Sequence, residues 1–113
     1  METLPLSPVT TTTSSALYLP QVHPLISGKW RLSLIYSLRG GTLRYGEIRR
    51  MHPQISEKVL VYELKDLTEL GAVERIAYRS MPPRVDYKLT PKGQLVLQLI
   101  GHLQQTEQAM QVG

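Results

Sequence analysis

One stretch, residues 55–71 (ISEKVLVYELKDLTELG), restricts the possible folds of this chain more than any other. Its pattern predicts a single helix with two unlike faces. Ser56 stands where an N-cap side chain would accept a free backbone N–H, and Gly71 can turn left-handed just after the end. Leucines recur at steps of four, three and three residues, which predicts one buried stripe formed by Leu60, Leu64, Leu67 and Leu70. The opposite side is cationic and aromatic, so we expect a partner to lie against it.

Two β-type runs follow this helix, at residues 73–78 and 84–89. The stretch between them, RSMPP, holds two prolines and predicts a stiff turn, so the two runs should form a hairpin. A short helix over residues 44–50 and a turn over 51–54 are expected before the long helix. This order of parts predicts a fold that is mainly α with a small β-hairpin, a helix-turn-helix with a wing. DNA is the natural partner of such an arrangement.

The second run of the hairpin alternates between apolar and charged residues. Alternation of this kind predicts one packed face and one solvated face. We therefore expect Val85, Tyr87 and Leu89 to pack on the helices, with Asp86 and Lys88 in water.

The N-terminal part of the chain is different in character. Residues 1–15 are rich in Thr, Ser and Pro, which predicts a disordered tail before a single domain over residues 16–112. Residues 16–26 are expected to form an irregular arm or short helical turns, because prolines interrupt any long helix there. The next helix is expected over residues 28–38, with Trp30, the only tryptophan, as a core anchor.

A last helix is expected from Thr90, an N-cap, and Pro91, a residue suited to the first helical position. Its apolar face is broader than one small domain needs to cover. We therefore expect a second subunit to pack against this face, at Leu95, Val96, Leu99, Ile100 and Leu103. The polar end, residues 104–113, is expected to fray.

The charge of the chain is concentrated in its centre. All thirteen lysines and arginines lie within residues 28–93, against seven acidic residues, a net charge of +6 in that segment. Such a basic domain suits a polyanion, because each phosphate contacted releases counterions. With 113 residues and no cysteine, the chain predicts one domain without disulfides, and no apolar run is long enough for a membrane span. A cytoplasmic protein without membrane contact is expected.

No catalytic or cofactor-binding constellation is recognisable. The three histidines are widely separated and have no acidic neighbours at ligand-like spacing, so neither a metal site nor another cofactor is expected. No glycine-rich phosphate loop or activated nucleophile is found, and the chain is not expected to be an enzyme.

The assembled motifs resemble those of the HxlR-type family of bacterial winged helix-turn-helix transcriptional regulators. The matching stretches are GKW at residues 28–30, RYGEIRR at 44–50, ISEKVL at 55–60, ELGAVER at 69–75 and PPRVDYKLTPKG at 82–93. The resemblance covers roughly residues 22–100. It implies a homodimer that binds an operator with two half-sites. We expect this homodimer to be joined through its terminal helices and to act as a repressor.

The resemblance also implies which residues meet DNA, namely Arg44, Ser56, Lys58, Tyr62, Lys65, Arg79 and Arg84. A structural role within the protein stays open for three of these residues. Lys65 could pair with Glu69, Tyr62 could pack against the wing, and Arg84 could pair with Asp86 or Glu74.

Two features depart from the family pattern. The cysteine sensor that many members carry would fall near Leu17, so thiol sensing is excluded. The long helix carries Val61, Tyr62 and Glu63 where polar or basic residues are common, which leaves the operator undetermined. A rival interpretation is a winged-helix protein-interaction module without specific DNA binding. A cavity between the terminal helices and the domain would have room for a small-molecule effector, which no motif identifies.

Overall fold

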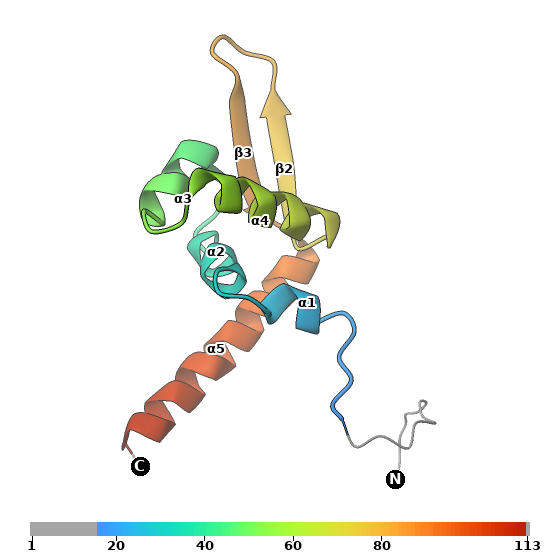
Figure 1. The fold of residues 1–113 in the computed structure, drawn as a ribbon, viewed down its shortest axis with the longest axis vertical. Coiled ribbons are helices and arrows are strands. Elements are labelled where there is room, and N and C mark those ends of the chain that lie inside the picture. Colours follow the sequence, from blue (N-terminus) through green and yellow to red (C-terminus); the bar gives the residue numbers. More distant parts are fainter. Residues whose placement is uncertain (1–15, 113) are drawn as a thin grey trace.

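The computed structural model describes residues 16–112, so the tail expected at residues 1–15 lies outside the described residues. The elements in chain order are α1 (His23–Ile26), α2 (Arg31–Ser37), β1 (Leu43–Arg44), α3 (Tyr45–Met51), α4 (Glu57–Glu69), β2 (Val73–Tyr78), β3 (Arg84–Leu89) and α5 (Pro91–Val112). The β2–β3 hairpin and the C-terminal end of α5 project in opposite directions from the central helices (Figure 1). The fold is mainly helical with a small antiparallel sheet, and the winged helix-turn-helix prediction is confirmed.

Helix α4 forms as its sequence predicts. The Ser56 hydroxyl accepts a hydrogen bond from the Val59 backbone N–H at 3.3 Å, which satisfies one of the free donors of the first turn. Three leucines of the stripe are buried, since Leu60, Leu64 and Leu67 are at most 1% exposed, and Leu70 packs partly buried against the same core. Gly71 has a φ of +86°, the left-handed conformation that ends the segment. The stripe thus fixes which side of α4 faces outward.

The sheet has three antiparallel strands in the order β1-β3-β2. The hairpin register runs from Val73 opposite Leu89 to Tyr78 opposite Arg84. Strand β1 pairs with the other edge of β3, with Arg44 opposite Asp86. Because β3 is therefore the central strand, the sheet connects the wing to the start of α3.

This topology corrects the expectation that Asp86 meets water. Asp86 is only 2% exposed, although Lys88 on the same strand is exposed as expected. The cross-strand neighbours of Asp86 are Arg44 on β1 and Ile76 on β2, and directly opposed residues share one face of a sheet. The sequence-based prediction treated β3 as one strand of an isolated hairpin, whereas β3 is paired along both edges.

Helix α2 begins later than predicted. Gly28 has a φ of +87°, and the helix starts only at Arg31. Trp30 is consequently the N-cap residue, partly exposed, and packs at the edge of the core with the Lys29 ammonium 4.9 Å from its ring centre. The core anchor role expected for Trp30 is taken instead by Leu34, Ile35 and Leu38.

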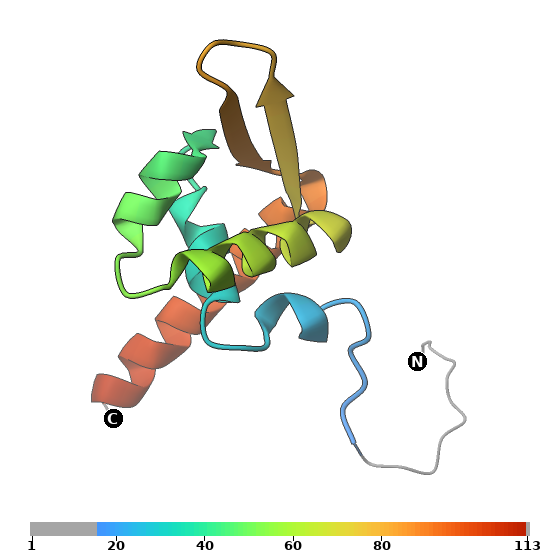
Figure 2. The same ribbon diagram turned by 45° about the horizontal axis from the view of Figure 1, so that its top comes forward.

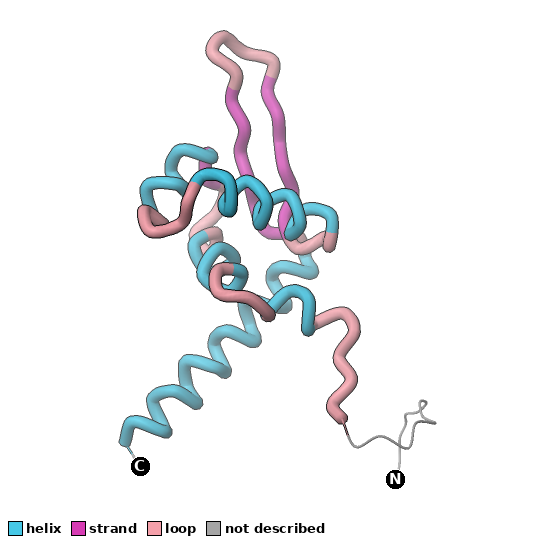
Figure 3. Tube along the Cα trace, in the orientation of Figure 1, coloured by secondary structure: helices cyan, strands magenta, loops and turns pink. Residues whose placement is uncertain are grey.

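Helix α5 packs on the domain with its first turns and then extends away from it, as Figures 2 and 3 both show. The residues expected to fray are helical up to Val112. Val96 and Ile100 are 5% and 7% exposed and belong to the core of this same subunit. They are thus not free to meet a second subunit, which corrects their assignment to a dimer interface.

Candidate nucleic-acid interface

The outward side of α4 carries an exposed stripe that we call the outer stripe, formed by Lys58, Tyr62 and Lys65. Steps of four and three residues place these side chains on one line along the helix, opposite the buried leucines. Tyr62 is 60% exposed. Within residues 16–112 neither lysine takes part in an ion pair, so the pairing of Lys65 with Glu69 is not formed. Two unpaired cations are therefore presented beside an aromatic ring.

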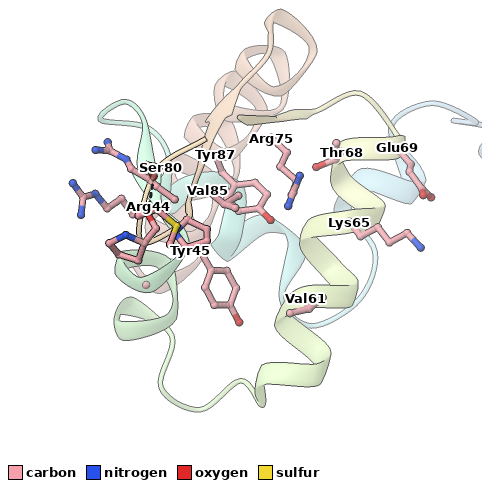
Figure 4. Close-up of a pocket in the computed structure, with 15 residues that line it drawn as sticks. Arg44, Tyr45, Val61, Lys65, Thr68, Glu69, Arg75, Ser80, Val85 and Tyr87 are labelled. Carbon is pink, nitrogen blue, oxygen red and sulfur yellow. Dashed lines mark hydrogen bonds between the residues drawn. The ribbon is translucent and has the colours of Figure 1, made fainter. Parts of the chain in front are cut away.

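A groove separates α4 from the wing (Figure 4). Val61, Lys65 and Thr68 line it from α4, and Arg75 points toward α4 from β2. Tyr62 is not among the lining residues, so it does not pack against the wing. The side chain of Arg75, which was not among the residues expected to meet DNA, adds a cation to the groove.

Tyr45, the first residue of α3, closes one end of this groove. Its hydroxyl is buried and has no hydrogen-bond partner among the described residues. Burial raises the pKa of Tyr45, and the negative charge of Glu57 adds to this effect. The ring therefore stays neutral and acts as an apolar wall between α3 and α4.

Arg79 and Arg84, the two arginines of the wing that were predicted to meet DNA, are in different states. Arg84 donates two hydrogen bonds to Asp86, at 2.9 and 3.0 Å, and its guanidinium lies 5.2 Å from the centre of the Tyr78 ring. Arg79 is exposed and makes no such contact within the described chain. It stands at the start of the hairpin tip, residues 79–83, where Met81 is 95% exposed. Arg79 is thus a free cation of the wing within the described residues, whereas Arg84 takes the pairing with Asp86 that the sequence had left open.

The Arg84–Asp86 pair makes the stability of the wing depend on pH. Hydrogen bonds from Arg84 hold the pKa of Asp86 below its ordinary value of 3.8, although burial acts in the opposite direction. The ionised carboxylate thus contributes stability above about pH 4, and the contribution is lost as the pH falls toward the lowered pKa. We expect Asp86→Asn to be less stable than the wild type at pH 7 and to show a smaller further loss on acidification.

Urea unfolding of both proteins between about pH 2.5 and 7 measures this difference. Glu74→Gln is the matched control, because the Glu74 carboxylate makes only an exposed pair with Lys88 at 3.7 Å. Identical pH profiles for Asp86→Asn and the wild type would refute the role assigned to the pair.

An arginine brace sets the position of α4. Arg31, the first residue of α2, donates to Glu63 at 2.7 Å, to the Pro24 carbonyl at 2.8 Å and to Asp66. The side chain of Arg31 is 11% exposed and that of Glu63 is 15% exposed. Although burial tends to lower the pKa of Arg31, the two carboxylates outweigh it and raise this pKa, so the charge is permanent. The brace holds the flank of α4 against α1 and α2, and it leaves the outer stripe free.

Sequence analysis missed this brace. The available signal was a pair of acids, Glu63 and Asp66, three residues apart beside the leucine stripe. Nothing in the sequence indicated that Arg31 lies across from them, since the contact spans more than thirty residues.

The other predicted site residues are divided between two places. Arg44 and Arg84 line the same groove as Lys65. Ser56 lies at the N-terminal end of α4, in a separate shallow depression shared with Arg49 and Arg50. Two further cations near the wing already have partners within the described residues, because Lys88 pairs with Glu74 across the hairpin and Lys92 donates to the Leu70 carbonyl at 3.0 Å.

The candidate dimer surface is narrower than predicted. Leu95 and Leu103 are 64% and 43% exposed, and Leu99 is half-buried between them. Steps of four residues place the three leucines on one side of α5. No helix within residues 16–112, α5 included, is long and apolar enough to cross a membrane.

Fold and site together define a winged helix-turn-helix protein with a cationic outward face. The profile of the HxlR-like helix-turn-helix family matches residues 25–111, and the chain belongs to this family. The resemblance based on the sequence motifs is thereby confirmed.

Individual relatives agree with this assignment. The chain is 35% identical over 79 residues to YdeP of Bacillus subtilis (strain 168), named as an HTH-type transcriptional regulator, in a match that covers 70% of this chain and 62% of that relative. It thus spans less than two thirds of the length of this curated relative.

Among solved structures, a transcriptional regulator assigned to the MarR family from Porphyromonas gingivalis W83 superposes with a TM-score of 0.76 at 34% identity, covering 88% of this chain and 97% of that one. The redox regulator HypR in its oxidised form superposes with a TM-score of 0.70 at 31% identity, covering 76% of this chain and 89% of the other. The present 113 residues contain no cysteine, so a thiol-based redox response has no chemical basis within them.

Proposed function

We propose that this protein is a transcriptional regulator that binds double-stranded DNA through α4 and the wing. The observation that carries the proposal is the outer stripe, with two unpaired lysines on a helix whose other side is fixed by a leucine core and by the Arg31 brace. Such a helix is held rigidly and still offers free side chains to a partner. The relatives named as transcriptional regulators support the same function.

The dimensions of α4 are suited to a major groove. Its thirteen residues span about 20 Å at 1.5 Å per residue, and a major groove is about 12 Å wide. We assign Lys58, Tyr62 and Lys65 to the groove, with Ser56 at its entrance. Arg44 and Arg79 would hold the phosphate backbone on either side, and such contacts set the register of the complex. Arg84 stabilises the wing through its hydrogen bond to Asp86, and we assign it a smaller contribution to DNA binding.

We further propose a homodimer joined through α5. Leu95, Leu99 and Leu103 give a ridge of exposed or half-exposed leucine side chains that extends beyond the domain. Two copies related by a twofold axis would present two α4 helices to an operator with two half-sites. Residues 16–112 would form the DNA-binding and dimerising unit, which acts in the cytoplasm as a repressor by occupying a promoter and has no catalytic role.

The test is selection of bound duplexes from a random-sequence pool, followed by titration of one selected duplex and of its shuffled sequence. We expect the selected duplex to bind at least about a thousandfold more tightly at physiological salt. Affinity for both duplexes should fall steeply as salt rises, because phosphate contacts release counterions.

A protein-interaction module is the second candidate, and the exposed ring of Tyr62 favours it, since such a ring suits a protein partner as well. That function predicts equal, weak binding to both duplexes and little response to salt.

Sedimentation of the free protein tests the proposed homodimer separately. We expect Leu103→Glu to shift the measured mass of the protein from that of two subunits toward that of one.

A further inference from the structure

The outward side of α4 carries two exposed apolar side chains among its cations. Val61 is 51% exposed and Tyr62 is 60% exposed. Val61 lines the groove between α4 and the wing, and Tyr62 occupies the centre of the outer stripe, with lysines at both ends. Exposure of these apolar groups to water is unfavourable. They are therefore suited to a partner surface that is apolar at two points and negatively charged around them.

Valine restricts what that surface can be on a DNA duplex. Its side chain neither donates nor accepts a hydrogen bond, so Val61 can distinguish bases only by apolar contact. The edges of the base pairs expose one apolar group in the major groove, the C5-methyl group of thymine. The flat ring of Tyr62 offers the same kind of contact one residue further along, within reach of an adjacent base pair.

We propose that α4 reads thymine methyl groups through Val61 and Tyr62, an inference that rests on the proposed function. Each half-site then carries thymine at the positions that face these two side chains. Lys58 and Lys65 contact the phosphates or guanine edges on either side. Part of the sequence specificity of α4 thus comes from apolar contacts with the bases.

The chain offers a matched control on the same helix. Val59 is also a valine and is 38% exposed, but it lies two residues from Val61 and hence on the other flank of α4. It does not line the groove. Val59→Ser and Val61→Ser make the same chemical change, in which both methyl groups of valine are lost and one hydroxyl group is gained, with nearly the same effect on helix propensity.

The experiment uses one duplex selected from the random-sequence pool. Each thymine of a half-site is replaced in turn by deoxyuridine, which removes only the methyl group. We expect affinity to fall roughly fourfold at one or two positions, the effect of losing one buried methyl-sized group. Val61→Ser, which has no methyl group left to contact thymine, should abolish this sensitivity at one position, whereas Val59→Ser should keep it.

Tyr62 is tested in the same way. Tyr62→Phe retains the ring and should retain the sensitivity to deoxyuridine at its position, whereas Tyr62→Ser should remove it. Thermal unfolding of all four variants verifies that the fold is kept.

The outcomes separate this inference from the proposed function. Binding that is tight and salt-dependent but unaffected by every deoxyuridine would overturn the reading of methyl groups and leave the DNA-binding function standing. Equal behaviour of Val59→Ser and Val61→Ser would overturn it as well. Failure to select any duplex would instead remove the proposed function itself.

Discussion

Replacing Gly93 with alanine is expected to lower the free energy of unfolding by about 3 kcal/mol. A Cβ atom at this position would lie 2.2 Å from the backbone oxygen of Ala72, too close for any real contact. The neighbour cannot move aside easily, because the same Ala72 oxygen accepts the backbone N–H of Thr90 at 3.1 Å. The Thr90 hydroxyl in turn donates to the Gly71 carbonyl. The added methyl group would therefore push the start of α5 away from the turn that follows α4.

Urea unfolding at neutral pH measures this loss, and Gly101→Ala on the same helix is the control. A Cβ atom at Gly101 meets nothing within 4 Å, so this substitution should stabilise the protein by up to about 1 kcal/mol through helix propensity. Equal effects of the two substitutions would mean that the close approach of α5 to Ala72 is not a feature of the folded protein.

Charge reversal on the proposed interface is expected to have the second large effect. Lys58→Glu and Arg79→Glu should each weaken binding to a selected duplex roughly tenfold to a hundredfold, because each removes a phosphate contact and introduces a repulsive charge. Neither side chain has a partner within residues 16–112, so the stability of the free protein should change by less than about 0.5 kcal/mol. Fluorescence anisotropy titrations at fixed salt give the affinities.

Lys29→Glu is the matched control for these reversals. It changes the net charge by the same amount, and it belongs to the segment between α1 and α2. That segment lies on the side of α4 away from the hairpin (Figures 1 and 2). If all three variants bound equally weakly, only the overall charge would matter, and no specific face could be assigned to DNA.

The sequence was sufficient for α4 because its signals are local. Ser56 caps a helix that begins at the next residue, Gly71 adopts the left-handed conformation, and the leucine spacing alone defined the buried side. The outward position of Lys58, Tyr62 and Lys65 followed from the same periodicity. The hairpin was predictable for a similar reason, since its two β-type runs flank a turn rich in proline.

Three features that the sequence did not reveal depend on contacts between distant parts of the chain. The burial of Asp86 depends on the pairing of β3 with β1, a strand of two residues, and on the bond from Arg84. The Arg31 brace joins α2 to α4, whereas the periodicity of a sequence describes each helix by itself. Val96 and Ile100 were assigned to a partner subunit because the sequence cannot tell a surface covered within one subunit from one covered by another.

Photo-crosslinking tests most directly the claim that the outer stripe and the hairpin tip face the duplex. The photoreactive residue benzoyl-phenylalanine replaces Tyr62, Met81 or Leu103, one at a time, all exposed and located on α4, the hairpin tip and α5. On illumination with a selected duplex, we expect covalent DNA adducts from positions 62 and 81, and protein–protein adducts from position 103. DNA adducts from position 103 with none from 62 or 81 would contradict the account.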